Sequence, residues 1–276
     1  MKSSWIYCSL FSEIINWGLV MKDGIKPILV KLSSTDNFRI RIDFLNGPNI
    51  QFALFTNQKE CAKVAREIDL HFKSFFLHSK LYEKPTSLPF NTLFIPFPQN
   101  SIHYGLYAFD LLAEGHQSNL RSLLSEIILV SLTDNLDDSS ILTLGLYLNL
   151  SIIMVYNLLP DRRPKTLHVR LLEIYPINQL SIDKAEDFVK ANRNILTEIL
   201  SDVSVNDFTE NQSLIWLTRW QKYLKINMTK QGVKVNEYCL IVATTINEFL
   251  GFDSETVQLL NVLIHKSISS EQRFII

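Results

Sequence analysis

Residues 38–44 carry the pattern that most limits how this chain can fold. The segment reads Phe-Arg-Ile-Arg-Ile-Asp-Phe, so apolar and charged residues alternate with the period of two that is typical of a β-strand. A turn-forming Asn-Gly-Pro-Asn sequence follows at 46–49, and a second apolar segment spans 50–55. Together the three segments predict a β-hairpin.

The alternation places Arg39, Arg41 and Asp43 on one face of the predicted strand. Two neighbouring arginines on one face repel each other unless water solvates that face or an anion binds there. An anion clamp on a rigid strand is one interpretation. A solvated sheet face is the other, and the strand taken alone favours it.

The remainder of the N-terminal part predicts a second strand and several helices. A strand at 5–10 leads into a helix at 11–21, which should break at Asp23-Gly24 before a further helical segment at 25–32. A helix is expected at 58–77, and the proline-rich stretch 82–100 should be loop and edge strand. The aromatic segment 101–109 fits either strand or loop.

From residue 118 onward the pattern is helical. Helices are expected at 118–133, 139–158, 182–200, 212–228, 236–250 and 254–265, with Asp253 or Ser254 as the N-cap of the last. The chain is therefore expected to be an α+β protein, with a mixed sheet in residues 1–117 packed with a mainly helical part in residues 118–276. We expect one domain over 1–276.

Composition narrows the function classes. The formal net charge of −1 gives no overall electrostatic case for binding nucleic acid or a membrane surface. The three cysteines are far apart and form no CxxC pair, which favours a reducing compartment without disulfides or a cysteine zinc site. The apolar run 141–159 contains polar residues and is expected to be a buried helix. The expected location is cytoplasmic, without a signal peptide.

No motif for a nucleotide, a metal or a serine nucleophile is present, and the six histidines show no metal-ligand spacing. His265 follows an apolar helical run, where it can act as a general acid or base or complement the helix dipole. The segment 103–110 brings His103, Tyr104, Tyr107 and Asp110 together, either in a substrate cleft or in an aromatic core.

The order of these features resembles a known family. The features are the aromatic strand Trp5-Ile6-Tyr7, the Arg39-Ile40-Arg41 strand after a Ser/Thr-rich turn, a helix and a proline-rich stretch before a tyrosine-containing segment, and a terminal apolar helix with His265. This chain is similar to the C-terminal, small-LanB domain of lantibiotic dehydratases, which also occurs as a stand-alone thiopeptide-type bacteriocin biosynthesis protein.

The resemblance implies one of two activities on a ribosomally made peptide. One branch eliminates glutamate from glutamylated Ser or Thr. The other, the thiopeptide pyridine synthases, joins two dehydroalanines in a formal aza-[4+2] cycloaddition and then releases water and the leader peptide. Neither activity requires a metal or redox cofactor, so none is expected.

Departures from the eliminating branch favour the pyridine synthase branch. The eliminating branch has a Tyr-x-x-Glu-x-x-Arg-Tyr-Gly-Gly-like segment, which corresponds to residues 104–110 here. In this chain Tyr107 replaces the Glu and Asp110 replaces the Arg. Elimination needs cations that hold the leaving glutamate. The family's Asn-Arg after the terminal His is Ser269-Ser270 here, although Arg273 is close.

The resemblance therefore implies a pyridine synthase in which Tyr104, Tyr107 and His265 handle protons, while Arg39, Arg41, His103 and Arg273 bind substrate. The expected partners are a leader-bearing precursor peptide, held for example by strand addition to a sheet edge, and other biosynthetic enzymes of the same pathway. The alternatives are a stand-alone glutamate-elimination lyase and a non-catalytic peptide-binding subunit.

Overall fold

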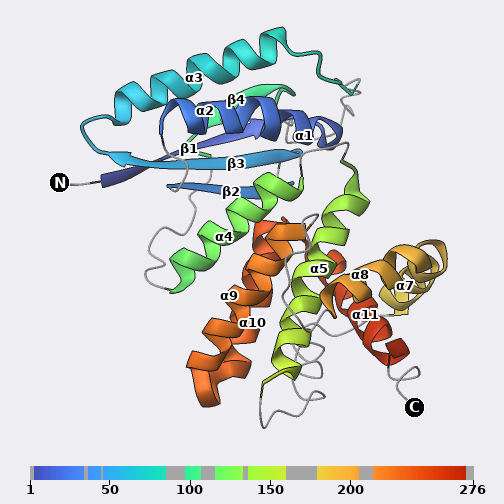
Figure 1. The fold of residues 1–276 in the computed structure, drawn as a ribbon. Coiled ribbons are helices and arrows are strands. Elements are labelled where there is room, and N and C mark those ends of the chain that lie inside the picture. Colours follow the sequence, from blue (N-terminus) through green and yellow to red (C-terminus); the bar gives the residue numbers. More distant parts are fainter. Residues whose placement is uncertain are drawn as a thin grey trace. The chain divides into compact units, whose positions relative to one another are not determined.

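A computed structural model describes residues 3–33, 37–44, 46–84, 97–106, 116–132, 136–159, 179–204 and 214–271. The chain divides into two compact units, drawn in Figure 1. Unit 1 comprises Met1–Ile141 and Phe249–Gly251, and unit 2 comprises Leu142–Glu248 and Phe252–Ile276. The boundary at residues 141–142 falls within one helix.

Unit 1 contains a four-stranded sheet in the order β2-β3-β1-β4. Its strands are β1 (Ser3–Phe11), β2 (Phe38–Asp43), β3 (Asn49–Asn57) and β4 (Ser101–Tyr104). Helical segments lie between β1 and β2 and between β3 and β4, so the chain follows the β-α-β-β-α-β path of a ferredoxin-like fold. Each described strand pairing is antiparallel, whereas a mixed sheet was expected. This topology inserts an antiparallel strand between each pair of parallel strands, which explains the difference.

The predicted hairpin is confirmed. Strand β3 pairs with β2 in the antiparallel register that sets Asp43 opposite Asn49 and Phe38 opposite Leu54. The connecting turn contains a hydrogen bond from Gly47 N to Phe44 O at 3.2 Å. The apolar side chains of β2 are buried and its charged side chains are half-buried.

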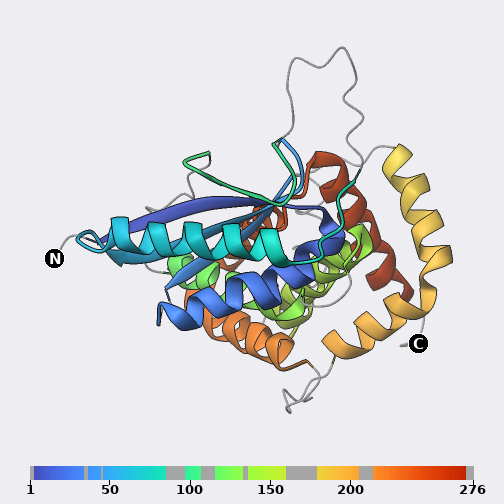
Figure 2. The same cartoon turned by 90° about the horizontal axis from the view of Figure 1, so that it is seen from above.

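One face of the sheet, which we call the helix-covered face, packs against helices. It presents Ile40, Phe52, Cys8 and Leu10, which are buried. Helix α3 (Cys61–His78) packs here through Phe72, whose ring centroid lies 6.2 Å from that of Phe52. Figures 1 and 2 show α3 beside α2 (Lys26–Lys31) on this side of the sheet. The α+β class is confirmed by this arrangement.

A continuous helical run connects β1 to β2, although a break at Asp23-Gly24 was expected. It consists of η1 (Ile14–Asn16), α1 (Trp17–Leu19), the π-helix η2 (Val20–Ile25) and α2. Pro27 has no N–H and its ring clashes with regular α geometry one turn earlier, which accounts for the wider π turn. The imidazole of His71 donates to Gly24 O at 2.7 Å and satisfies a carbonyl of this segment.

Helix α4 (His116–Ser131) belongs to unit 1 and packs on β2. Helix α5 (Asp138–Asn157) starts in unit 1 and continues into unit 2. The stretch Ser139–Asn157 is long and apolar enough to cross a membrane, but most of it is buried within the folded chain. The expectation of a buried helix is thus confirmed.

Unit 2 contains helices and no strand among its described residues. Beyond α5 it contains α7 (Gln179–Ala191), α8 (Arg193–Val203), α9 (Ile215–Gln231), η4 (Gly232–Lys234), α10 (Val235–Phe249) and α11 (Ser254–Glu271). One helix was expected over 182–200, but it is interrupted at Asn192, whose side chain donates to Phe188 O at 3.1 Å. Buried polar bonds join the helices, such as Trp220 Nε1 to Leu148 O at 3.2 Å.

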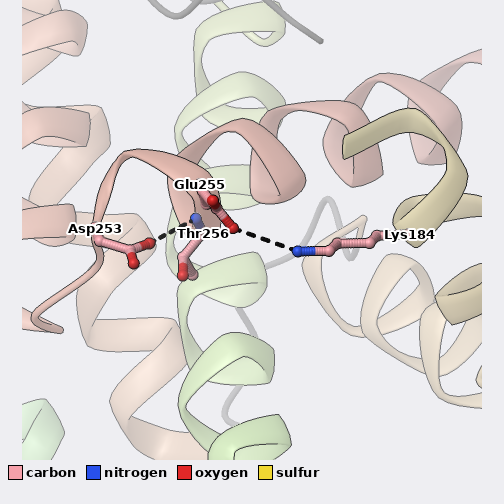
Figure 3. Close-up of polar contacts among 4 residues, drawn as sticks. All are labelled: Lys184, Asp253, Glu255 and Thr256. Carbon is pink, nitrogen blue, oxygen red and sulfur yellow. Dashed lines mark hydrogen bonds and ion pairs between the residues drawn. The ribbon is translucent and has the colours of Figure 1, made fainter. Parts of the chain in front are cut away.

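Asp253 caps α11, as one of the two expected N-caps. Its carboxylate accepts a hydrogen bond from Thr256 N at 2.8 Å, and this bond lowers the Asp253 pKa (Figure 3). The next residue but one, Glu255, pairs with Lys184 of α7 at 3.3 Å, also drawn in Figure 3. Lys266 and Glu186 form a second α11–α7 ion pair at 2.8 Å.

Candidate functional site

The second face of the sheet is polar, and we call it the polar face. The strand register aligns Arg41 of β2, Gln51 of β3, Ser9 of β1 and His103 of β4 in one row across the four strands. Side chains aligned in this way project from the same face. The structure thus brings three of the predicted substrate-binding residues, Arg39, Arg41 and His103, onto one face.

The guanidinium of Arg39 binds the protein itself. Nη1 donates to Phe38 O at 2.7 Å and to Ser122 Oγ at 3.2 Å, and Nη2 donates to the carbonyl and hydroxyl oxygens of Ser118 at 3.2 and 3.1 Å. The guanidinium also lies 5.1 Å from the ring centroid of Trp5. Arg39 therefore ties helix α4 to β2.

Both burial and nearby charges act on Arg39. Burial lowers the pKa of Arg39, and repulsion from Arg121 of α4 lowers it further, while Glu126 acts in the opposite direction. Arg121 is a third arginine, close enough to act on Arg39, and sequence reasoning did not identify it. Ser118, Ser122 and Ser125 have the i, i+4, i+7 spacing of one helix face. This spacing was the available sign that a polar face of this helix packs against the arginine strand.

Gln51 lies at the centre of the polar face and is only 1% exposed. Its Nε2 donates to Asp43 Oδ2 at 2.9 Å, and its Oε1 accepts no hydrogen bond from any described residue. A buried amide oxygen without a donor is unfavourable by about 1–3 kcal/mol. The row therefore contains a buried acceptor that no described residue satisfies. Sequence reasoning did not identify Gln51, because its segment reads as an ordinary strand.

His103 stands at the β4 end of the row. Its ring packs at 4.5 Å from Phe97 and 5.5 Å from Phe11, and its Nε2 lies 3.0 Å from Ser101 Oγ. Burial lowers the pKa of His103, which favours the neutral imidazole.

Tyr104 projects from the helix-covered face, on the other side of the sheet from the arginines and His103. Its register partner is Cys8, and its hydroxyl donates to Ala65 O of α3 at 3.2 Å. Burial raises the pKa of Tyr104 well above its usual value, and the neighbouring Cys8 and Asp69 add to the effect. The phenol therefore stays protonated and does not share a face with Arg39 and Arg41.

The remaining predicted site residues are His265, Tyr107 and Arg273. His265 is exposed on α11 of unit 2. The helix continues past it to Glu271, so His265 does not complement the helix C-terminus as one interpretation required. Tyr107 and Arg273 lie outside the described residues.

No group of three or more His, Cys, Asp or Glu side chains suited to a metal occurs among the residues that the structure describes. No disulfide joins Cys8, Cys61 or Cys239. Burial raises the pKa of the Cys8 thiol well above its usual value, so Cys8 is not a thiolate nucleophile.

Comparison with known proteins gives a structural likeness only. No protein-family model matches the chain, and no curated protein matches its sequence. Among solved structures, the pyridine synthase TbtD from thiomuracin biosynthesis superposes with a TM-score of 0.65 at 14% identity, covering 96% of this chain and 98% of TbtD. TsrL superposes with a TM-score of 0.56 at 13% identity, covering 99% of this chain and 96% of TsrL. Over nearly its whole length, this chain has the fold of TbtD and TsrL.

Proposed function

We propose that this chain is a thiopeptide pyridine synthase. The observation that carries the proposal is the near-complete mutual coverage with the pyridine synthase TbtD. The order of the strand, helix and histidine segments supports the family, and the departures from the eliminating branch at Tyr107 and Asp110 support the pyridine synthase branch.

The proposed reaction closes a six-membered ring between two dehydroalanines of one linear peptide. One backbone amide tautomerises to its iminol, which together with the adjacent dehydroalanine alkene forms a 2-azadiene. Two new carbon–carbon bonds then form, one from the alkene end and one from the iminol carbon of this diene to the second dehydroalanine, and the nitrogen enters the ring with the bonds it already has. Loss of the iminol oxygen as water and of the leader peptide as an amide aromatises the ring, so no oxidant is required. Most of the acceleration would come from holding the two alkenes face to face.

We assign substrate binding to the polar face, with Arg41, Arg39 and His103, and to Arg273. Arg41 lies in the row with Gln51, and its half-buried guanidinium suits a carbonyl oxygen of a peptide. Arg39 would act by positioning, because its guanidinium already binds α4. The polar face thus suits a substrate rich in amides.

We assign proton transfer to Tyr104, Tyr107 and His265. In this proposal residues 1–276 act as one functional domain. The raised pKa of Tyr104 keeps the phenol protonated, so it would donate a hydrogen bond to a developing oxyanion rather than act as a base. The neutral imidazole of His103 is a further candidate for proton transfer at the iminol.

The experiment incubates the purified chain with a dehydrated, azole-containing precursor peptide and follows the products by mass spectrometry. We expect a macrocycle and a released leader. The variant Arg41→Gln should raise KM more than it lowers kcat, whereas the control Lys31→Met, which breaks an exposed pair with Glu67, should change neither. Failure to release the leader from any of several such precursors contradicts the proposal.

One observation favours a second candidate, the glutamate-elimination lyase. Arg121 adds positive charge near Arg39, so the cations that bind a leaving glutamate are not confined to the two arginines of β2. This function predicts that a glutamylated precursor loses glutamate when the chain is added. It also predicts that the glutamyl adduct accumulates with Arg121→Gln.

A further inference from the structure

The two outer edges of the unit 1 sheet differ in their backbone hydrogen bonding. In an edge strand, alternate residues direct their N–H and C=O groups away from the sheet, where a further strand can pair with them. The strand register and the backbone hydrogen bonds identify which residues these are for β2 and for β4.

The β2 edge is closed. The hydroxyl of Ser125 on α4 accepts from Ile40 N at 3.0 Å, so Phe38, Ile40 and Ile42 direct their backbone groups outward. Arg39 Nη1 donates to the outward Phe38 O. At Ile42 the approach of Gly251 is so close that a Cβ at that position would lie 2.8 Å from Ile42 O. No further strand has room to pair with this edge.

The β4 edge is open as far as the described residues show. Ser12 N donates to Pro48 O across the β1–β3 pair, so Ser9 and Phe11 of β1 must direct their backbone groups toward β4. Their partners on β4 are His103 and Ser101. Ile102 and Tyr104 therefore direct theirs outward, and no described residue bonds to them there.

We propose that an extended segment of the peptide substrate adds to this edge as a fifth strand, pairing with the backbone of Ile102 and Tyr104. The identity of the occupant rests on the proposed function. The location rests on the alternation of inward and outward backbone groups along β4. Peptide recognition by strand addition uses main-chain bonds for affinity and alternate side chains for specificity.

A second copy of the chain fits this edge less well. Strand β4 has four residues, so it is about 13 Å long. Pairing over that length buries far less than the roughly 1,200 Å² that a stable dimer requires. Gly105, with φ of 72°, ends the strand and prevents its extension. A single extended peptide needs no more than this length.

Strand addition would give the two faces of β4 separate roles. Alternate side chains of the added segment would lie beside His103 and Phe97 on the polar face. The remaining ones would lie beside Tyr104 and α3 on the helix-covered face, where Tyr104 is 40% exposed. His103 and Tyr104 would thus both contact the substrate although they point in opposite directions.

The first experiment measures amide hydrogen exchange of the wild-type chain, alone and with the linear leader-bearing precursor encoded in the same gene cluster. We expect exchange at Ile102 and Tyr104 to slow at least tenfold with the peptide, and exchange at Ile40 to stay the same. Unchanged exchange at both β4 amides overturns the inference. Slow exchange of these two amides in the absence of the peptide also overturns the inference, because a second copy or another segment of this chain would then cover the edge.

The second experiment measures binding of the fluorescein-labelled precursor to Ile102→Pro by fluorescence anisotropy. Proline removes only an outward N–H, so pairing with β1 should persist, and we expect the Kd to rise about tenfold. The matched control Ile102→Val keeps the N–H and should bind like wild type. Equal binding by Ile102→Pro, with its melting temperature preserved, overturns the inference.

The outcomes separate the inference from the proposed function. If wild type forms the pyridine while its β4 amides stay unprotected, the inference is wrong and the function stands. If the β4 amides become protected but no pyridine forms, the function is wrong and strand addition stands.

Discussion

Closure of the β2 edge predicts an unusual sensitivity at Ser125. This side chain is fully buried, and its hydroxyl accepts from Ile40 N at 3.0 Å while donating to Arg121 O at 2.7 Å. The Arg121 carbonyl also accepts a backbone hydrogen bond within the helix, so losing the bond from the Ser125 hydroxyl costs little. Ser125→Ala leaves the Ile40 N–H without its acceptor, and an unsatisfied buried donor costs about 1–3 kcal/mol.

Ser131 provides a matched control on the same helix. Its hydroxyl donates only to Ile127 O at 2.7 Å, one turn earlier, so Ser131→Ala should change the free energy of unfolding by about 0.5 kcal/mol or less. Urea unfolding followed by circular dichroism measures both variants, and hydrogen exchange measures the Ile40 amide. Equal unfolding free energies for the two variants, with unchanged exchange at Ile40, would refute the edge-closure argument.

Three further predictions concern other positions. Gly251→Ala should destabilise more than Gly105→Ala in thermal melts, because both have positive φ but only a Cβ at 251 meets a backbone oxygen at 2.8 Å; equal losses would contradict this. The lowered pKa of Asp253 means that its cap stabilises the fold above the ordinary pKa of about 3.9, and that this stabilisation is lost as pH falls through the folded-state pKa. Asp253→Ala should therefore lower the free energy of unfolding by about 1 kcal/mol at pH 7 and match wild type in strong acid. The lowered pKa of His103 predicts that its NMR titration midpoint lies below about 6.5, and that stability falls as pH drops below that value; His103→Gln should flatten this part of the profile.

Local patterns predicted the hairpin because both of its determinants lie close together in the sequence, within residues 38–55. The period of two fixes which side chains of β2 share a face, and the turn residues fix the connection to β3. The face reached by Tyr104 depends on the pairing of β4 with β1, which lies far away in the sequence, and no local pattern specifies that register.

The role of Arg39 also lay beyond sequence reasoning. Alternation predicts a charged face, but the hydrogen bonds from Arg39 to Ser118 and Ser122 depend on how α4 packs on β2. The π turn near Pro27 is a comparable case. A proline and a glycine normally interrupt a helix, yet tertiary contacts such as that of His71 with Gly24 O keep this helix continuous.

The central claim is that the chain forms a pyridine from two dehydroalanines and expels the leader. One liquid chromatography–mass spectrometry run on a reaction with the dehydrated precursor measures the macrocycle and the leader amide together. The account predicts that both products form in equimolar amounts, at a combined mass lower than that of the substrate by one water. Loss of glutamate from a glutamylated precursor, with no macrocycle from the dehydrated one, would contradict it.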